Sequence, residues 1–333
     1  GLSFVELGGV SPNPKISLVR KGVALCRREG LDFVLAVGGG SVIDSAKAIA
    51  MGAATGRDPW EFASTGTRPD KTLPVATVLT LAASGSETSN SCVLTNEETK
   101  EKRGITSETN RPVISFLDPE NTFTVSKFQT GCGIVDIMMH TLERYLTPEG
   151  GESDLTDRIA EGLLIATRDA GRRAIADPRD YEARATLMWA GSVSHNDYTG
   201  CGRKRLFPVH KLEHELSAFR DEIAHGAGLS VLFPAWAEHE MQYDYPRFAQ
   251  FANRVLGVEM DFEHPERTAR EGIRTLRRFF EEIGMPTHLS QLGIKPENYE
   301  KLAANTVRTV NGPVKSYSPL DEKAIIEIYR LAE

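Results

Sequence analysis

One aspartate and three histidines in this 333-residue chain have the types and spacing of ligands for a divalent metal ion. Asp136 and His140 are four residues apart, so on a helix their side chains leave the same face one turn apart. His210 and His225 follow in a second histidine-containing segment. Three imidazoles and a carboxylate suit Fe²⁺ or Zn²⁺, and such an ion can polarise an alcohol or carbonyl oxygen. The spacing therefore predicts a metal site with Asp136, His140, His210 and His225 as its ligands. The alternative for Asp136 and His140 is a simple hydrogen bond or a solvated helix face.

Two short segments have the composition of loops that bind a dinucleotide. Residues 37–41, VGGGS, follow an expected strand and open an expected helix. Glycines there let backbone amides approach a pyrophosphate, whose negative charge the helix N-terminus favours. Residues 80–87, TLAASGSE, offer small hydroxyl side chains for a phosphate, ribose or carboxamide. The alternatives are a tight strand–helix turn for the first segment and an ordinary polar loop for the second.

The elements that must position these residues change in character along the chain. Residues 32–37, 74–79 and 113–117 are expected strands, and a helix is expected from residue 41 to about 54, which together predict a parallel sheet with covering helices. After about residue 126 apolar residues recur at helical spacing, over 130–146, 155–176, 181–197, 208–219, 228–240, 265–283 and 321–332. We therefore expect an α/β nucleotide-binding domain over residues 1–124 and an all-α domain over 125–333.

Composition excludes several classes of function. The net charge is −7, which disfavours binding to nucleic acid or to an anionic membrane. Apolar stretches are much shorter than the roughly 20 residues of a membrane helix, and the first residues do not resemble a signal peptide. Four scattered cysteines without a CxxC pair are typical of free thiols in a reducing cytoplasm. We expect a cytoplasmic enzyme with no nucleic-acid or membrane partner.

Taken together, these motifs resemble the iron-containing (group III) alcohol dehydrogenase family, over about residues 5–292. The likeness is greatest to its NADPH-dependent aldehyde reductase and butanol dehydrogenase branch. The segments that carry it are FVELGGVSPNP, FVLAVGGGSVIDSAKAIA, TLAASGSETS, FLDPENTFTVS, GIVDIMMHTLERYLT, HKLEHELSA and FFEEIGMPTHLSQLGI. The resemblance implies a dehydroquinate synthase-like fold, a divalent metal that is Fe²⁺ or Zn²⁺, NADP(H) rather than NAD(H), and a homodimer. It also implies that this chain lacks the family's usual N-terminal segment.

The resemblance further implies roles for individual residues. It makes Asp136, His140, His210 and His225 the metal ligands, and it places His214 close to the nicotinamide. The residues implied to bind the cofactor are Gly39, Gly40, Ser41, Asp44, Thr80, Ser84 and Lys102. The remaining histidines, His195, His239, His264 and His288, are expected to be surface or structural residues.

The expected reaction is hydride transfer between NAD(P)H and a small aldehyde or primary alcohol, with His214 as the candidate proton relay. Two alternatives stay open on the sequence. The first is another enzyme of the same superfold, such as a glycerol dehydrogenase or a dehydroquinate-synthase-like lyase. The second is a chain that binds metal but holds its cofactor poorly, because the N-terminal segment is missing.

Overall fold

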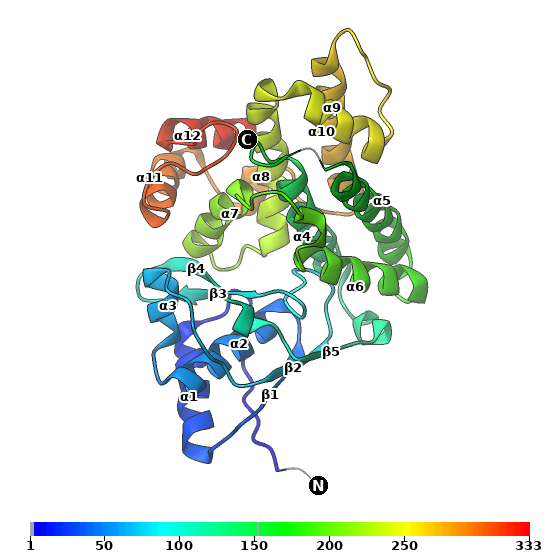
Figure 1. The fold of residues 1–333 in the computed structure, drawn as a ribbon. Helices are drawn as coiled ribbons and strands as arrows, with labels where there is room; N and C mark the ends of the chain where they lie inside the picture. Colours follow the sequence, from blue (N-terminus) through cyan, green and yellow to red (C-terminus); the bar gives the residue numbers. More distant parts are fainter. Residues whose placement is uncertain (1–2, 152) are drawn as a thin grey trace. The chain divides into compact units, whose positions relative to one another are not determined.

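The computed structural model describes residues 3–151 and 153–333. The chain forms two compact units (Figure 1), which we describe separately. The first, the α/β unit, consists of Gly1–Thr80 and Ser86–Asp118, and the second, the helical unit, consists of Leu81–Gly85 and Pro119–Glu333. No helix among the described residues is long and apolar enough to cross a membrane. The structural division after Asp118 lies a few residues before the predicted boundary, which remains a prediction.

The α/β unit contains a three-stranded parallel sheet, as the sequence pattern predicted. Strands β1 (Val34–Gly38), β2 (Val75–Leu79) and β5 (Ile114–Leu117) lie in the order β1-β2-β5. Its helices are α1 (Ile16–Glu29), α2 (Gly40–Thr55), α3 (Pro59–Thr65) and the short η1 (Glu108–Asn110). The β1–α2–α3–β2 segment is the helical crossover that joins two parallel strands.

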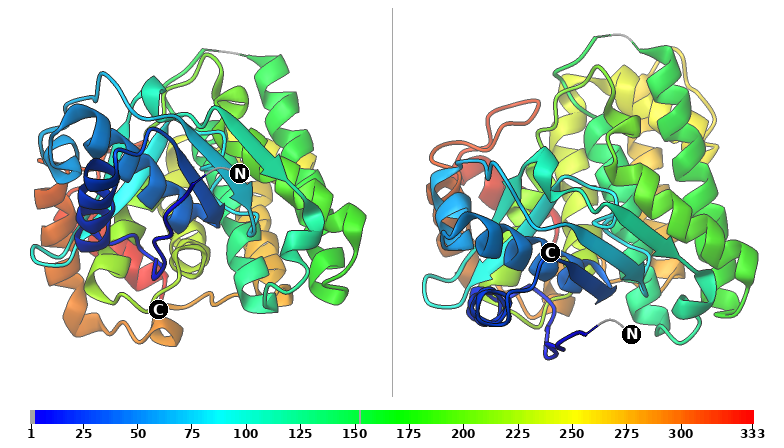
Figure 2. Two further views of the ribbon diagram at one scale, coloured as in Figure 1. Left: turned by 90° about the horizontal axis from the view of Figure 1, so that it is seen from below. Right: turned by 60° about the horizontal axis from the view of Figure 1, so that its bottom comes forward.

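One face of this sheet is apolar and exposed. Leu35 and Ile114 flank Ala76 in register, and Val37 and Phe116 flank Val78. These four flanking side chains are 50–57% exposed, whereas Ala36, which points to the other side of β1, is buried. Figure 2 shows the three strands in front of α2 when the chain is seen from below. Among the described residues, helices therefore cover only one face of this sheet.

The sequence pattern did not predict an antiparallel hairpin that follows β2. Strands β3 (Ser91–Asn96) and β4 (Glu101–Thr106) pair so that Lys102 lies opposite Thr95. The alternate residues Cys92 and Leu94 are buried, as is Ile105 across the hairpin, and the turn residue Lys100 has a φ of 55°. This alternation is the signal that could have identified the hairpin.

The second unit is helical throughout its described part, apart from isolated bridges, which confirms the predicted fold class. Its α-helices are α4 (Lys127–Tyr145), α5 (Asp154–Ala176), α6 (Tyr181–His195), α7 (Pro208–Phe219), α8 (His225–Glu240), α9 (Tyr245–Leu256), α10 (Pro265–Glu282), α11 (Tyr299–Thr309) and α12 (Glu322–Leu331). Short 3₁₀ turns are η2 (Pro119–Thr122), η3 (Tyr198–Gly200), η4 (Met241–Tyr243), η5 (Leu289–Leu292) and η6 (Pro296–Asn298). The sequence pattern missed α9 and α11.

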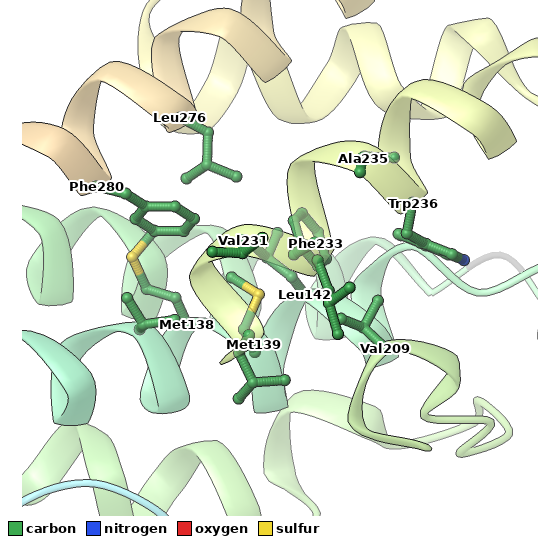
Figure 3. Packing of buried hydrophobic residues seen from close by; sticks show 14 of the residues in the cluster. Met138, Met139, Leu142, Val209, Val231, Phe233, Ala235, Trp236, Leu276 and Phe280 are labelled. Atoms are coloured by element: carbon green, nitrogen blue, oxygen red, sulfur yellow. The ribbon is translucent and has the colours of Figure 1, made fainter. Parts of the chain in front are cut away.

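Helices α4 and α8 form the centre of the helical unit. Met138 and Met139 of α4 and Val231 and Phe233 of α8 are almost completely buried in one apolar cluster (Figure 3). Every residue of α4 from Thr130 onward is buried, so a polar side chain on this helix has no access to bulk water. Polar groups in such a place need a specific partner.

Residues 81–85 pack against the helical unit through glycines of α4 and α6. A Cβ atom on Gly133 would lie 2.1 Å from the carbonyl oxygen of Ala82, and one on Gly191 would lie 3.3 Å from that of Ala83. Gly85 has a φ of +65°, which disfavours a residue with a side chain. The loop that carries Ser84 is thus a part of the helical unit.

Candidate metal centre and cofactor-binding residues

Helix α4 presents the first two predicted ligands on one face. Asp136 and His140 are one turn apart and only 4% and 6% exposed. The Nδ1 atom of His140 lies 2.9 Å from the main-chain oxygen of Asp136 and 3.1 Å from its Oδ1 atom. With Nδ1 directed at the main chain, Nε2 is the atom of His140 that is available for a ligand.

The other two histidines come from the beginnings of two further helices. His210 is in the first turn of α7, and His225 is the first residue of α8. Their Nε2 atoms each lie 3.7 Å from Oδ1 of Asp136. Ligand atoms of Asp136, His210 and His225 all lie within 4.8 Å of one another, a grouping that could hold one metal ion.

The donor atoms at the centre of this group fit a divalent ion. Oδ1 of Asp136 and Nε2 of His210 are buried and form no hydrogen bond within the described part of the chain. Buried polar atoms of this kind normally have a partner, and an imidazole nitrogen beside a carboxylate is a usual ligand set for Fe²⁺ or Zn²⁺. His140 lies outside the compact three-residue group, but its ring centroid is 4.5 Å from that of His210.

Charges in the centre influence one another strongly. Burial would raise the pKa of Asp136, but the surrounding imidazoles, His140 foremost, hold it well below its usual value. Burial lowers the pKa of His140. Burial would also lower the pKa of His210, but the Glu143 carboxylate outweighs it and raises that pKa to about 9. Without a metal, the centre therefore combines an ionised carboxylate with a protonated His210.

Two more aromatic side chains lie next to the centre. The ring centroid of His195, at the end of α6, is 4.2 Å from that of His140, and the Phe207 centroid is 5.1 Å from that of His210. Sequence reasoning treated His195 as a surface or structural residue because nothing in its spacing connects it to α4. The buried Arg144 joins the two residues, since it donates to Nδ1 of His195 and stacks on Phe207.

His214 lies one turn after His210 on α7. Its ring centroid is 5.7 Å from that of His225, and it belongs to a second possible ligand group with Glu213 and His225. It does not join the group formed by Asp136, His210 and His225. The role expected for His214, beside the metal ligands rather than among them, stays a prediction.

The α/β unit holds the glycine-rich segment at the carboxyl ends of two neighbouring strands. Gly39 is the N-cap of α2, no side chain caps this helix end, and Gly40 and Ser41 form its first turn. Thr80 directly follows β2, and its N–H donates to the carbonyl oxygen of Gly38 at 3.1 Å. A helix N-terminus at the carboxyl end of a parallel sheet suits a pyrophosphate. This turn therefore fits a dinucleotide.

Asp44 has a different environment from the one that its motif suggested. Its Oδ1 accepts from the Ser86 hydroxyl at 2.5 Å, and its Oδ2 accepts from the Val93 N–H at 2.8 Å. Burial raises the pKa of Asp44, although the charges of Lys47 and Lys102 oppose the rise. Oδ1 therefore connects α2 to the segment before β3, and Oδ2 connects it to β3 itself. A contact between Asp44 and a cofactor stays a prediction. Lys102 on β4 is 7% exposed, and its predicted cofactor contact also stays a prediction.

Comparison with known proteins identifies the family of this chain. The family model "Iron-containing alcohol dehydrogenase" matches residues 1–119, and "Fe-containing alcohol dehydrogenase family, C-terminal" matches residues 130–332. NADH-dependent butanol dehydrogenase A of Clostridium acetobutylicum is 40% identical over 330 residues, which cover 99% of this chain and 84% of that protein. The NADPH-dependent aldehyde reductase YqhD of Escherichia coli is 35% identical over 88% of this chain and 76% of its own length.

A solved structure of a related enzyme has a similar fold. The crystal structure of NADH-dependent butanol dehydrogenase A from Thermotoga maritima has a TM-score of 0.93 and 36% identity, and the match covers 98% of this chain and 83% of that one. The two family models together span nearly the whole sequence. This chain therefore belongs to the iron-containing alcohol dehydrogenase family.

Proposed function

We propose that this chain reduces a small aldehyde to a primary alcohol at a metal centre formed by Asp136, His140, His210 and His225. Metal-dependent hydride transfer between NAD(P)H and an aldehyde or alcohol follows from membership of the family. The observation that carries the assignment of the site is the convergence of Asp136, His210 and His225 from three different helices. Oδ1 of Asp136 and Nε2 of His210, which form no hydrogen bond within the described part of the chain, are the atoms that a bound ion would satisfy.

The proposed roles divide the chemistry among the residues. When bound, a divalent ion supplies Lewis-acid chemistry and a reduced nicotinamide supplies hydride. Asp136, His210 and His225, with His140 beside them, would hold the ion in an apolar helical core that limits water. In this proposal His214 would deliver a proton to the substrate oxygen, directly or through water. Phe207 provides an apolar wall next to His210.

The proposed cofactor site begins at the N-terminus of α2. Gly39, Gly40 and Ser41 would bind the pyrophosphate, and Thr80, Ser84 and Lys102 would contact the remainder of the dinucleotide. The preference for NADP(H) over NAD(H) is a prediction, since the relatives include enzymes named for each cofactor. A homodimer and a cytoplasmic location are predictions of the same kind.

One set of assays tests this function. The chain, loaded anaerobically with Fe²⁺ or with Zn²⁺, should oxidise NADPH or NADH in the presence of butanal, and metal removal by a chelator should abolish the reaction. Butanol oxidation should be faster than glycerol oxidation at equal concentrations. Faster turnover of glycerol would favour the glycerol-dehydrogenase alternative, and absence of turnover with a fully loaded metal site would overturn the proposal.

A further inference from the structure

Two fully buried glutamates pair with two of the proposed metal ligands. Glu143 lies on α4 and Glu213 on α7, and neither side chain has any exposed surface. One carboxylate oxygen of Glu143 is paired with Nδ1 of His210, and one of Glu213 is paired with Nδ1 of His225. Burying a carboxylate costs free energy unless it is paired and hydrogen-bonded, so these contacts require an explanation.

The second oxygen of each glutamate is also occupied. Oε1 of Glu143 accepts from the N–H of Val209 at 2.6 Å, and Val209 lies in the first turn of α7. Glu143 therefore supplies the acceptor that a helix N-terminus lacks, and it does so from another helix. Oε1 of Glu213 accepts from the hydroxyl of Ser217, one turn further along α7. With both oxygens fixed, neither carboxylate can rotate away from its histidine.

Helix α8 has a glycine, Gly228, at the position that faces the Glu213 side chain. A Cβ atom on Gly228 would lie 2.7 Å from Cγ of Glu213 and 3.2 Å from its Oε1. Gly226, one residue after His225, would in turn bring a Cβ atom within 2.2 Å of the Cys132 carbonyl oxygen on α4. The start of α8 therefore packs closely against both helices that hold its metal-site partners.

These contacts have one consequence for all three imidazoles. Nδ1 of His210 and of His225 is occupied by a carboxylate, and Nδ1 of His140 is occupied by a main-chain oxygen. A neutral histidine, the form that binds a metal, presents the lone pair of Nε2 when it donates from Nδ1. Nε2 is the atom that His210 and His225 direct at Asp136, at 3.7 Å in both cases.

We propose that Glu143 and Glu213 are positioning residues that orient His210 and His225 for the metal, an inference that rests on the proposed function. Partners of this kind fix the tautomer and ring orientation of a ligand, and their loss typically lowers metal affinity about 10- to 100-fold. Nδ1 of the third imidazole, His140, faces the main-chain oxygen and Oδ1 of Asp136, which is itself a proposed ligand, so the orientation of His140 comes from its own helix. The effect should therefore be confined to the two glutamates.

A different use of Glu213 is the competing explanation. Glu213, His214 and His225 lie close enough to hold a second ion by themselves. In that arrangement the Glu213 carboxylate would bind the ion, whereas here it is paired with Nδ1 of His225. The positioning role therefore predicts one metal ion per chain.

The test compares Glu143→Gln and Glu213→Gln with Glu240→Gln in the full chain. Glu240 is equally buried in the helical unit, where it pairs with His239 and two serines and touches no proposed ligand. Affinity for Co²⁺ is measured by competition with a chelator, and the visible spectrum of bound Co²⁺ reports the ligand geometry. We expect about 10- to 100-fold weaker binding and an altered spectrum in the first two variants. Glu240→Gln should change stability but neither of these readouts.

Three results would overturn the inference while leaving the proposed function intact. They are unchanged Co²⁺ affinity in folded Glu143→Gln and Glu213→Gln, an equal loss in Glu240→Gln, or two ions per wild-type chain. If the glutamate variants do not fold, Ser217→Ala tests the same point, because it frees one oxygen of Glu213 and should weaken Co²⁺ binding and shift the spectrum to a smaller extent. An unchanged Ser217→Ala would then count against the inference. Failure of the wild-type chain to bind Co²⁺ would instead contradict the metal centre itself.

Discussion

Arg247 of α9 forms a bidentate pair with Asp157 of α5. Its Nη1 lies 2.6 Å from Oδ2 of the aspartate and its Nη2 lies 2.7 Å from Oδ1. Arg203 contacts the same carboxylate, and the guanidinium of Arg247 stacks 3.7 Å above the ring of Tyr145. The cluster joins α4, α5 and α9, so its charge state should affect the stability of the helical unit.

The first prediction concerns this ion pair. Burial would raise the pKa of Asp157, but hydrogen bonds and charge from Arg247 lower it below the usual value. A lowered carboxyl pKa contributes stability that is complete above the unfolded pKa of about 4 and is lost as pH falls through the folded value. Asp157→Asn should cost about 3 kcal/mol at pH 7, because the largely buried guanidinium groups of Arg203 and Arg247 lose the carboxylate that neutralises them.

Urea denaturation at pH 7 and at several values below pH 4 measures this effect. The difference between wild type and Asp157→Asn should shrink as the pH falls. Asp169→Asn on the same helix is the control, since its ion pairs are exposed and should contribute less than about 1 kcal/mol. A difference that does not depend on pH would contradict the assignment.

The second prediction concerns the proposed ligands. His210→Ala and His225→Ala each remove a member of the compact group, so the metal content of the anaerobically loaded chain should fall sharply in both. His140→Ala should also lose metal if its Nε2 completes the set. Elemental analysis of the three variants beside wild type gives the result. Full occupancy with intact activity in all three would show that the ion binds elsewhere.

The third prediction concerns His214. Because this residue lies beside the compact ligand group, His214→Gln should keep its metal and lose about 10²- to 10⁴-fold in turnover. Metal content and kcat with butanal are measured on the same preparation. Loss of metal together with activity would mean that His214 is a ligand and that its role has been exchanged with that of His210.

The fourth prediction concerns the packing of the loop that carries Ser84. A methyl group at position 133 would meet the Ala82 carbonyl at 2.1 Å, so Gly133→Ala should displace the loop. We expect a loss of about 1–3 kcal/mol and weaker NADPH binding, measured by denaturation and calorimetry. Gly162→Ala is the matched control, because a Cβ atom there meets no neighbour within 4 Å and alanine favours a helix by about 1 kcal/mol. Equal behaviour of the two variants would contradict the proposed contact.

The fifth prediction concerns the uncovered face of the parallel sheet. Its exposed apolar side chains should cause association that increases with protein concentration. Replacing Leu35 and Phe116 together by threonine should reduce it in sedimentation velocity experiments. Phe262→Ser serves as the control, since Phe262 is 90% exposed and lies outside this face. If both variants associate as wild type does, the sheet face is not responsible.

The sequence predicted the elements that have strong periodicity. The three parallel strands and the helices around Asp136 and His210 are confirmed to within a few residues. The hairpin that contains Lys102 was missed because its few apolar residues lie among many polar ones, so their alternation gives only a weak strand signal. Helix α9 was missed although its buried residues Phe248, Phe251 and Val255 recur at helical spacing, so the signal was present in the sequence.

The part of the candidate site that lies on one helix could be predicted from residue spacing. The i, i+4 spacing placed Asp136 and His140 together because both lie on one helix. Glu143 and Glu213 were not assigned a role, because each faces a histidine of another element and sequence spacing carries no information about that packing. His195 was missed for the same reason, since α6 brings it next to His140 across 55 residues of chain.

The short loop 81–85 limits how this chain could be divided or recombined. The chain passes between the two units three times, next to residues 80, 85 and 118. A gene cut after codon 118 would retain every proposed metal ligand but would separate the loop from Gly133 and Gly191, against which it packs. In a chimera of two relatives joined at that point, the loop would come from one parent and the glycines against which it packs would come from the other. Such chimeras should fold only when both parents have glycine at positions 133 and 191. The five residues of loop 81–85 therefore decide which relatives can exchange the two parts of the chain.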